Sequence, residues 1–231
     1  MSQRIGRPAG FKFTTIEKRF GSLYALRRLD LEITPGECVA LTGRNGSGKT
    51  TLLRVASQLT RPTRGEVTFS GIKNREAPMI GYVSHAVMLY DELSAEENLL
   101  LFARLLGVFE PLKRAEILLE ATNLTSRARS LVRTFSRGMK QRLAIARALL
   151  QEPGLLLLDE PGTGLDTESM AWLVKTVRGL RDEGRTIVMS VHGESALSQL
   201  ATRAARLEAG ALIADTRAGA TFQTVFAGGE A

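Results

Sequence analysis

The sequence predicts an α/β fold in which a strand-rich core is interrupted by a mainly helical segment. Strand and helix patterns alternate over residues 11–93 and again over 153–215, whereas residues 94–152 follow a helical pattern. The 231 residues, 44% of them hydrophobic, are enough to bury a core of this size. We therefore expect one domain built from these segments, followed by a tail at 216–231.

The first core segment is expected to contain several strands and one helix. Apolar residues alternate with polar ones, or form short runs, over 11–17, 29–33, 37–42, 66–69 and 79–84. A turn-rich basic stretch around Phe20 and Gly21 separates the first two strands. A helix is expected over 49–59, because a glycine-rich loop precedes it and Pro62 and Gly65 follow it.

The middle segment is expected to be mainly helical. Ser94 and Glu97, three residues apart, form a capping box that opens a helix through residue 106. A second helix is expected over 112–122, and a third from Ser136 to about residue 150.

Strands and helices alternate again in the second core segment. The expected strands are 154–158, 185–190, 204–208 and 211–214, and the expected helices are 167–182 and 194–200. The aliphatic run from Leu155 to Leu158 is typical of a strand buried on both faces. The Gly- and Ala-rich tail from Ala218 onward is assigned no fold.

Composition favours a chain that stays in the cytoplasm. No apolar run approaches the roughly 18–20 residues that cross a bilayer, and the N-terminus has no apolar core of the kind that a secretion signal carries. The single cysteine, Cys38, can form no internal disulfide, and its strand-like surroundings fit a small core residue.

The net charge of +7 has two interpretations. A basic protein can bind nucleic acid or anionic lipid. Alternatively, its cationic residues serve phosphate sites and subunit contacts. The basic residues of one stretch have no acid between them: Arg127, Arg129, Arg133, Arg137, Lys140, Arg142 and Arg147. We favour the second interpretation, because the same stretch contains a motif found in nucleotide-binding proteins.

A glycine-rich motif typical of phosphate binding follows the strand at 37–42. It matches the pattern G-x-x-x-x-G-K-[ST] with Gly43, Arg44, Asn45, Gly46, Ser47, Gly48, Lys49 and Thr50. Glycines let successive backbone N–H groups surround phosphate oxygens, and the next helix directs its positive dipole end at the same anion. Lys49 would supply charge to the β- and γ-phosphates, and Thr50 a hydroxyl to Mg²⁺. The strand before and the helix after disfavour an ordinary glycine-rich turn.

An acidic pair follows the aliphatic strand. Asp159 and Glu160 stand at its carboxyl end, where ligands bind in open α/β sheets. Asp159 is expected to hold the Mg²⁺ that bridges the phosphates, and Glu160 to orient and partly deprotonate the attacking water. A solvated strand end is the alternative, and the phosphate motif makes it the weaker one.

Further motifs narrow the class. Residues 135–142 read Phe-Ser-Arg-Gly-Met-Lys-Gln-Arg, residues 160–166 read Glu-Pro-Gly-Thr-Gly-Leu-Asp, and residues 187–192 read Ile-Val-Met-Ser-Val-His. In this order, and with the phosphate motif, they resemble the nucleotide-binding domain of ABC ATPases over about residues 11–215. The resemblance implies a P-loop NTPase fold of the ABC ATPase type, with a mixed sheet core, an antiparallel β subdomain and a helical subdomain. It also implies binding of ATP and Mg²⁺ and hydrolysis of ATP.

The signature motif of that family is matched only in part. Ser136 and Gly138 are present, and Ser136 would cap a helix whose N-terminus faces a γ-phosphate. The departures from the usual LSGGQ are Phe135, Arg137 and Met139. In the family, the signature helix of one subunit covers the ATP held by the other. The resemblance therefore implies a head-to-tail homodimer with two-fold symmetry.

The resemblance also implies roles for other positions. Phe20 would stack on adenine, and Thr51 would complete the phosphate motif. Asp166 matches the aspartate that couples the two sites. His192, at the end of a β-branched run, would contact the γ-phosphate.

One position departs from the family pattern after the strand at 79–84. The family usually has a glutamine that touches Mg²⁺ near the membrane-subunit contact, whereas this chain has His85, which is shorter and can titrate. We keep His85 as a candidate nucleotide and Mg²⁺ contact. Residues 82–98 resemble the ATP-binding subunit of the haem exporter of cytochrome c maturation. Another small exporter, of a drug, lipid or polysaccharide, is the alternative.

The partners implied by the resemblance are a second copy of the ATPase and membrane-spanning permease subunits. The permease would dock near His85 and the helices after Ser94, at the cytoplasmic face of the inner membrane, and no nucleic acid is expected. The rival is a soluble ABC ATPase that works on nucleic acid or ribosomes, supported by the net charge of +7. Proteins of that kind usually carry two such domains or a long coiled coil.

Overall fold

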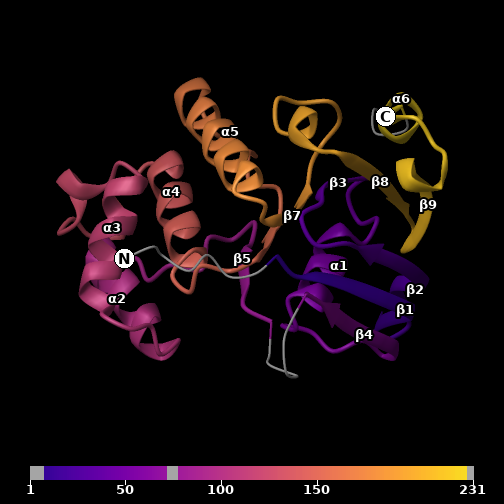
Figure 1. The fold of residues 1–231 in the computed structure, drawn as a ribbon, viewed down its shortest axis with the longest axis horizontal. Helices are drawn as coiled ribbons and strands as arrows, with labels where there is room; N and C mark the ends of the chain where they lie inside the picture. The colour runs from indigo at the N-terminus through magenta and orange to yellow at the C-terminus, as the bar shows by residue number, and fades with distance from the viewer. Residues whose placement is uncertain (1–7, 72–77, 228–231) are drawn as a thin grey trace.

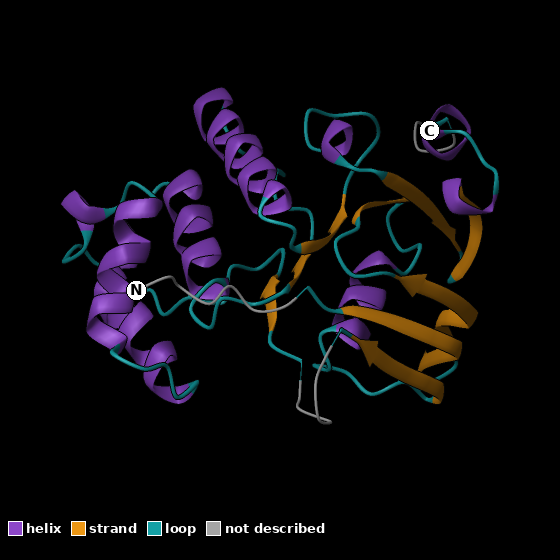
Figure 2. Ribbon diagram, viewed as in Figure 1, coloured by secondary structure: helices purple, strands orange, loops and turns teal. Residues whose placement is uncertain are grey.

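The structure is a computed structural model that describes residues 8–71 and 78–227 (Figure 1). It contains a six-stranded sheet in the order β5-β6-β7-β3-β8-β9 and a three-stranded sheet in the order β2-β1-β4. Figure 2 shows α2, α3 and α4 grouped at one end of the molecule and the smaller sheet at the other. The predicted fold class is confirmed: a mixed sheet core is joined by an antiparallel sheet and a group of helices.

The six-stranded sheet places the ends of its parallel strands at one edge. Its strands are β3 Cys38–Thr42, β5 Ile80–Val83, β6 Leu155–Leu158, β7 Thr186–Ser190, β8 Arg203–Glu208 and β9 Ala211–Asp215. All pair in parallel except β9, which runs antiparallel to β8. Strand β7 lies between β3 and β6, so the segments that leave these three strands meet at the same edge.

The two faces of this sheet belong to different hydrophobic cores. Alternate residues of β3, Val39 and Leu41, pack with α1 and with the antiparallel sheet. The intervening residues, Cys38 and Ala40, pack toward the larger helices. Cys38 is fully buried, and burial raises the pKa of its thiol to about 11, with Arg181 opposing the shift. It is a core residue, as predicted.

The antiparallel sheet extends further than the sequence predicts. Its strands are β1 Gly10–Phe20, β2 Leu23–Ile33 and β4 Arg64–Ser70. The predicted turn around Phe20 and Gly21 is present but shorter than expected: β1 continues through Phe20, which pairs with Leu23, and only Gly21 and Ser22 form the turn. Cation–π contacts hold the basic residues of this hairpin against its aromatic rings, with Lys18 over Phe20 and Arg19 over Tyr24. These contacts favour the extended strands on both sides of the turn.

The main helices begin at caps that the sequence supplies. They are α1 Lys49–Ala56, α2 Ala95–Leu105, α3 Pro111–Ala121, α4 Arg137–Ala148 and α5 Thr167–Asp182. The capping box at α2 is confirmed, since Ser94 Oγ accepts from the Glu97 N–H and the Glu97 carboxylate accepts from the Ser94 N–H. Ser136 caps α4 by its own side chain alone, since its Oγ accepts from the Met139 N–H at 3.2 Å.

The predicted helix over 194–200 is wrong. Only Ser198–Leu200 forms a helical turn, of the 3₁₀ type. Ser195 and Ser198 each accept a hydrogen bond from the other's backbone N–H, at 3.2 Å and 2.7 Å. These side-chain bonds offer the backbone an alternative to an α-helix.

The tail, to which the sequence analysis assigns no fold, has regular structure in part. Residues Thr216–Ala218 form a 3₁₀ turn and Phe222–Phe226 form a short helix, α6. Thr221 caps α6, and Val225 and Phe226 are buried against the larger core. Tertiary burial orders a segment whose composition gives no periodic signal. The residues after Ala227 lie outside the described part of the chain.

A buried ion pair fastens β8 to the end of β9. Arg203 donates to both carboxylate oxygens of Asp215, at 2.9 and 2.6 Å, and contacts Glu37 at 3.1 Å. Burial opposes ionisation of Asp215, but the hydrogen bonds from Arg203 and from the Arg217 N–H outweigh it and lower the pKa of the carboxyl. The charged carboxylate is therefore the form that stabilises the fold at neutral pH.

We expect Asp215→Ala to lower the free energy of unfolding by roughly 3 kcal/mol, because it leaves a buried guanidinium short of a partner. The pKa of Asp215 is lower in the folded state, so the loss should be full at pH 7 and shrink as the pH falls below about 4. Urea unfolding at several pH values measures this. Asp182→Ala, which removes an exposed carboxylate, is the control and should cost under about 1 kcal/mol. Equal losses in the two variants would contradict the assignment.

Candidate functional site

The loop between β3 and α1 has a backbone that only glycine fits at two positions. Gly43 has φ 140°, and a Cβ there would lie 2.2 Å from the Leu207 carbonyl oxygen. Gly48 has φ 109°, and its Cβ would lie 2.6 Å from the Ala25 carbonyl oxygen. Both glycines of the motif are therefore required by close backbone approaches. The N-terminus of α1 has no side-chain cap, so its N–H groups remain available to an anion.

Lys49 is held beneath this loop. Its side chain is buried, and its Nζ donates to the carbonyl oxygens of Gly43 and Arg44, at 2.6 and 3.2 Å. Burial lowers the pKa of Lys49, whereas the carboxylates of Glu160 and Asp159 oppose that shift. The ammonium group thus faces the acidic pair across the loop. Arg44, Asn45 and Gly46 are exposed at the tip, and the buried Ser47 hydroxyl has no partner within the described residues.

The carboxylate of Asp159 uses one oxygen for the protein and leaves the other free. Its Oδ1 accepts from Thr50 Oγ1 at 3.1 Å and from Ser190 Oγ at 2.8 Å. Its Oδ2 is buried and has no hydrogen-bond partner in the described chain. Burial, the charge of Asp159 and the closeness of the Tyr82 hydroxyl to the Asp159 carboxylate raise the pKa of Tyr82 to about 12, but that hydroxyl forms no hydrogen bond of regular geometry with Oδ2.

These residues fit a magnesium ion. A buried carboxylate oxygen without a partner, beside a threonine hydroxyl, provides oxygen ligands of the kind Mg²⁺ binds. Within residues 8–71 and 78–227, no group of three or more His, Cys, Asp or Glu side chains could hold a metal by itself. Mg²⁺ sites often use one or two protein ligands and complete the shell with phosphates and water.

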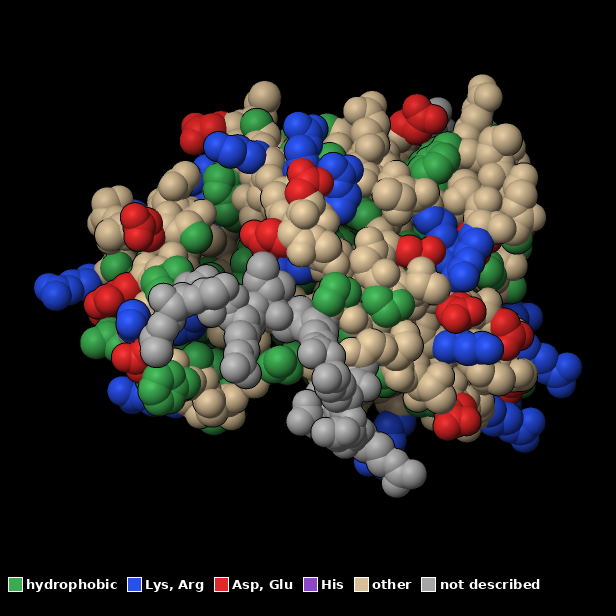
Figure 3. Space-filling view, viewed as in Figure 1, with side chains coloured by type: hydrophobic (Ala, Val, Ile, Leu, Met, Phe, Trp, Pro, Cys, Tyr) green, Lys and Arg blue, Asp and Glu red, His purple; other side chains and the backbone are tan. Residues whose placement is uncertain are grey.

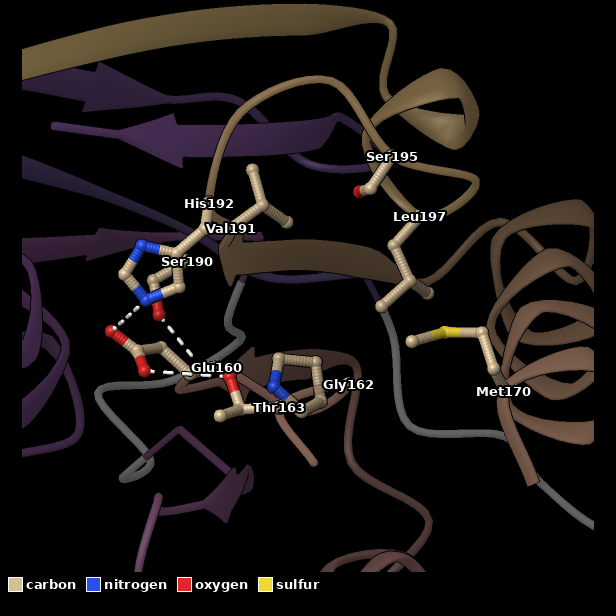
Figure 4. A pocket seen from close by; sticks show the side chains of 10 residues that line it. Glu160, Gly162, Thr163, Met170, Ser190, Val191, His192, Ser195 and Leu197 are labelled. Carbon is tan, nitrogen blue, oxygen red and sulfur yellow. Dashed lines mark hydrogen bonds and ion pairs between the residues drawn. The ribbon is translucent and has the colours of Figure 1, made fainter. Parts of the chain in front are cut away.

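Glu160 lies at the centre of a small group of side chains. His192 Nε2 lies 2.9 Å from its Oε1, and His85 Nδ1 lies 3.7 Å from its Oε2 (Figure 4 shows His192). The backbone of Glu160 is in the left-handed region, with φ 49°, which is uncommon for a residue with a Cβ. A cavity of about 190 Å³ adjoins it, lined by Glu160, Pro161, Gly162, Thr163, Met170, Ser190, Val191, His192, Ser195 and Leu197.

The structure brings some of the predicted residues together and leaves others apart. Those that converge are Lys49, Thr50, Asp159, Glu160, His192 and His85. Phe20 is exposed at the end of β1, and Asp166 caps α5 by accepting from the Ser169 N–H at 2.7 Å. Ser136 and Gly138 stand at the start of α4. Figure 1 shows α4 with α2 and α3 in one group, the helical lobe, away from α1.

Sequence reasoning missed Ser190 and Tyr82. Ser190 lies two residues before His192 in a run of otherwise apolar residues, and a polar residue at a buried strand end was the signal that could have found it. Tyr82 belongs to β5 and pairs with Leu157 of β6, and Leu157 stands two residues before Asp159. The sequence does not reveal that β5 and β6 are neighbours, so it could not bring Tyr82 to Asp159.

The basic stretch at 127–147 is largely engaged within the chain. Arg133, Lys140 and Arg142 pair with Glu92, Asp91 and Glu168. Arg147 donates to the Tyr82 carbonyl oxygen at 3.1 Å and lies over the Phe102 ring. Arg137 lies against Gly164, where a Cβ would be 2.9 Å from its guanidinium. These acids come from other segments, which explains why the stretch looks uncompensated in the sequence.

Comparisons with known proteins agree on one family. The family model described as ABC transporter matches residues 26–163. A daunorubicin resistance ATP-binding protein of Streptomyces coeruleorubidus is 40% identical over 86% of this chain, which spans 65% of that protein. A Nod factor export ATP-binding protein of Burkholderia pseudomallei is 36% identical over 90% of this chain, which spans 70% of it. An ABC transporter ATP-binding protein of Methanosarcina acetivorans is 38% identical, and this chain spans 40% of its length.

Solved structures give the same fold. A dimeric ATP-binding cassette in a post-hydrolysis state, bound to ADP and phosphate, has a TM-score of 0.79 and 29% identity, covering 89% of this chain and 97% of that one. A nucleotide-free cassette of an ABC transporter has a TM-score of 0.77 at 21% identity, covering 90% of each chain, and supports the fold alone.

Proposed function

Because this chain belongs to the ABC transporter family and has the fold of its ATP-binding cassettes, we propose that it is the ATP-binding and ATP-hydrolysing subunit of an ABC exporter. One observation carries the proposal. A buried lysine, a threonine hydroxyl bonded to an aspartate with an unpartnered oxygen, and a glutamate paired with a histidine come together where the segments after β3, β6 and β7 meet. This is the arrangement that phosphoryl transfer to water requires.

The phosphate loop binds the phosphates of the nucleotide in this proposal. Backbone N–H groups of residues 43–50 and the N-terminus of α1 surround the β- and γ-phosphates, and Lys49 moves from its carbonyl partners to the phosphate oxygens. The ring of Phe20, exposed on β1, is available to stack on the adenine. Thr50 and Asp159 would hold the magnesium ion, which neutralises charge on the phosphates when bound.

Glu160 is the base in this proposal. A water attacks the γ-phosphorus, the bond to the bridging oxygen of ADP breaks, and one water proton passes to the Glu160 carboxylate. His192 orients that carboxylate by its 2.9 Å contact and presents its other ring edge to the γ-phosphate. His85, 3.7 Å from the same carboxylate on its other oxygen, takes the place of the family's glutamine. The products are ADP and inorganic phosphate.

A second copy of the chain completes the site. Ser136 and Gly138 begin α4 in the helical lobe, so the α4 N-terminus of one subunit would cover the nucleotide bound by its partner. The dimeric state of a similar cassette supports a dimer, and the head-to-tail orientation is part of the proposal. Asp166, at the start of α5, then lies in the loop that would link the two sites.

The helical lobe carries an apolar surface suited to a permease. Large hydrophobic side chains are exposed on α2, on α3, on the loop between them and on the loop before α2: Met88, Tyr90, Leu105, Leu106, Phe109 and Leu112. Figure 3 shows hydrophobic side chains on this end of the molecule. Within the described residues, no helix is long and apolar enough to cross a membrane. We infer that this surface binds a permease at the cytoplasmic face of the membrane.

The names of the relatives are better evidence for the kind of exported molecule than His85 is. The haem exporter resemblance rests on residues 82–98, whereas the relatives are named for daunorubicin resistance and Nod factor export. We therefore favour the alternative, a small ABC exporter of another organic molecule. Haem export stays a prediction that nothing here supports.

The test is isolation of the tagged chain from detergent-solubilised membranes of cells that make it. A polytopic membrane protein should co-purify, and the complex should release phosphate from ATP with Mg²⁺ but not with EDTA. Phe109→Asp, on the apolar surface, should remove the partner, because the aspartate would be buried unpaired at the contact. Leu59→Asp, at another exposed apolar position, should retain it. A chain recovered only from the soluble fraction, with the permease present, would contradict the proposal.

A further inference from the structure

Ser190 occupies a central position between the two halves of the proposed site. It is the last residue of β7, the strand that separates β3, which leads to the phosphate loop, from β6, which leads to the acidic pair. Ser190 pairs with Leu41 of β3. The residue before it, Met189, pairs with Leu158 of β6. Ser190 is fully buried. It is a polar residue in a strand whose other members, apart from Thr186, are apolar.

The Ser190 hydroxyl is used in both of its capacities. A serine hydroxyl has one donor and two acceptor positions. The donor goes to Asp159 Oδ1 at 2.8 Å, and an acceptor position receives the Glu160 N–H, also at 2.8 Å. One oxygen atom therefore links the carboxylate proposed for magnesium to the backbone of the proposed base.

The bond to Asp159 fixes which of its oxygens is free. Thr50 and Ser190 both donate to Oδ1, so the carboxylate plane cannot rotate without breaking two hydrogen bonds. Oδ2 is then left buried and unpartnered in the described chain, and such a group calls for a ligand, an ion or a water that supplies donors or charge. Without the Ser190 bond, only the Thr50 hydroxyl would orient the carboxylate.

The bond to Glu160 fixes a strained turn. Glu160 has φ 49°, a conformation that costs a residue with a Cβ energy and persists where neighbours determine it. The Asp159 N–H still pairs with the Val83 carbonyl oxygen, so the chain leaves the sheet at Glu160, and Ser190 holds its N–H at that point. This turn directs the Glu160 side chain to His192 (Figure 4).

We propose that Ser190 is a positioning residue of the ATPase site, which aligns Asp159 for Mg²⁺ and Glu160 for the attacking water through one hydroxyl. The inference rests on the proposed function. Groups that orient metal ligands typically change metal affinity or activity by about 10–100-fold when they are removed. Ser190→Ala should lower both the affinity for Mn²⁺, used as a probe in place of Mg²⁺, and kcat by factors in that range. Nucleotide affinity in EDTA should change by less than about twofold, because Ser190 does not contact the phosphate loop.

The experiment titrates Mn²⁺ into the full chain with a non-hydrolysable ATP analogue and follows free Mn²⁺ by electron paramagnetic resonance. Ser190→Thr keeps the hydroxyl and should restore most of the Mn²⁺ affinity, whereas Ser190→Cys keeps the volume with a weak donor and should not. Thr186→Val is the matched control, because it removes a buried hydroxyl from the other end of β7, where Thr186 accepts from the Gly36 N–H. It should change thermal stability without changing Mn²⁺ affinity.

The outcomes separate the inference from the proposed function. If the unaltered chain binds no Mn²⁺ with the nucleotide analogue, the proposed function fails. If the unaltered chain binds and Ser190→Ala and Ser190→Cys bind equally well, the positioning role is overturned. If Ser190→Ala does not fold, Ser190→Cys decides in its place. A loss of affinity in Thr186→Val as large as in Ser190→Ala would show a general effect of β7 packing and would also overturn it.

Discussion

Glu160→Gln is expected to reduce ATP turnover by at least about 10²-fold while the chain still binds ATP, so that two copies remain together as an ATP-bound dimer. The glutamine amide has nearly the volume of the carboxylate and can still accept a hydrogen bond at the position His192 now contacts. It cannot take a proton from water, because an amide is not a base near neutral pH. Binding is retained because Lys49 and the phosphate loop are unchanged, and only the proton transfer is lost.

The measurement has two parts. Phosphate release with saturating Mg²⁺ and ATP gives turnover, and light scattering after size-exclusion chromatography gives the mass with and without ATP. Glu194→Gln is the control, because Glu194 is an exposed glutamate in the loop after β7 and should leave both values unchanged. Turnover within about threefold of the unaltered chain would remove Glu160 from the role of base. Lost turnover without an ATP-dependent dimer would remove the dimer from the proposal.

The sequence anticipates those parts of the molecule in which local pattern and tertiary structure agree. The four leucines of β6 predict a buried strand, and the glycine-rich motif predicts a loop between a strand and a helix; both are present. Ser94 and Ser136 are caps whose side-chain bonds act within one helical turn. Such features need no knowledge of distant residues, so a single sequence contains them.

The parts that sequence reasoning missed depend on contacts between distant residues. The helix α6 is ordered because Val225 and Phe226 fill space in the larger core. The role of Ser190 depends on β7 lying between β3 and β6, because its hydrogen-bond partners Glu160 and Asp159 are 30 and 31 positions away in the chain. The left-handed backbone of Glu160 is likewise held by that partner. The periodicity of apolar residues does not predict these contacts, because a local pattern does not determine the order of strands in a sheet.

Lys49→Ala is expected to remove measurable ATP hydrolysis and to weaken ATP binding by at least about 10²-fold. A hydrogen bond between charged groups contributes about 1.5–3 kcal/mol, and Lys49 can make more than one such bond to the β- and γ-phosphates from a buried position. Lys49→Arg should not restore binding, because the larger planar guanidinium does not fit where Nζ lies 2.6 Å from the Gly43 carbonyl oxygen. Lys175→Ala, at an exposed lysine of α5, is the control. Fluorescent ATP analogues measure affinity, and near-normal binding by Lys49→Ala would exclude the phosphate loop as the nucleotide seat.

The two substitutions test different steps, and their combination tests the link between them. Glu160→Gln traps a dimer only if ATP joins the two chains, and Lys49→Ala prevents ATP from binding. The double variant Lys49→Ala, Glu160→Gln should therefore remain a monomer at ATP concentrations that dimerise Glu160→Gln alone. If the double variant dimerised as readily, protein contacts rather than the shared nucleotide would hold the pair. Completion of each site by its partner's α4 would then lose its support.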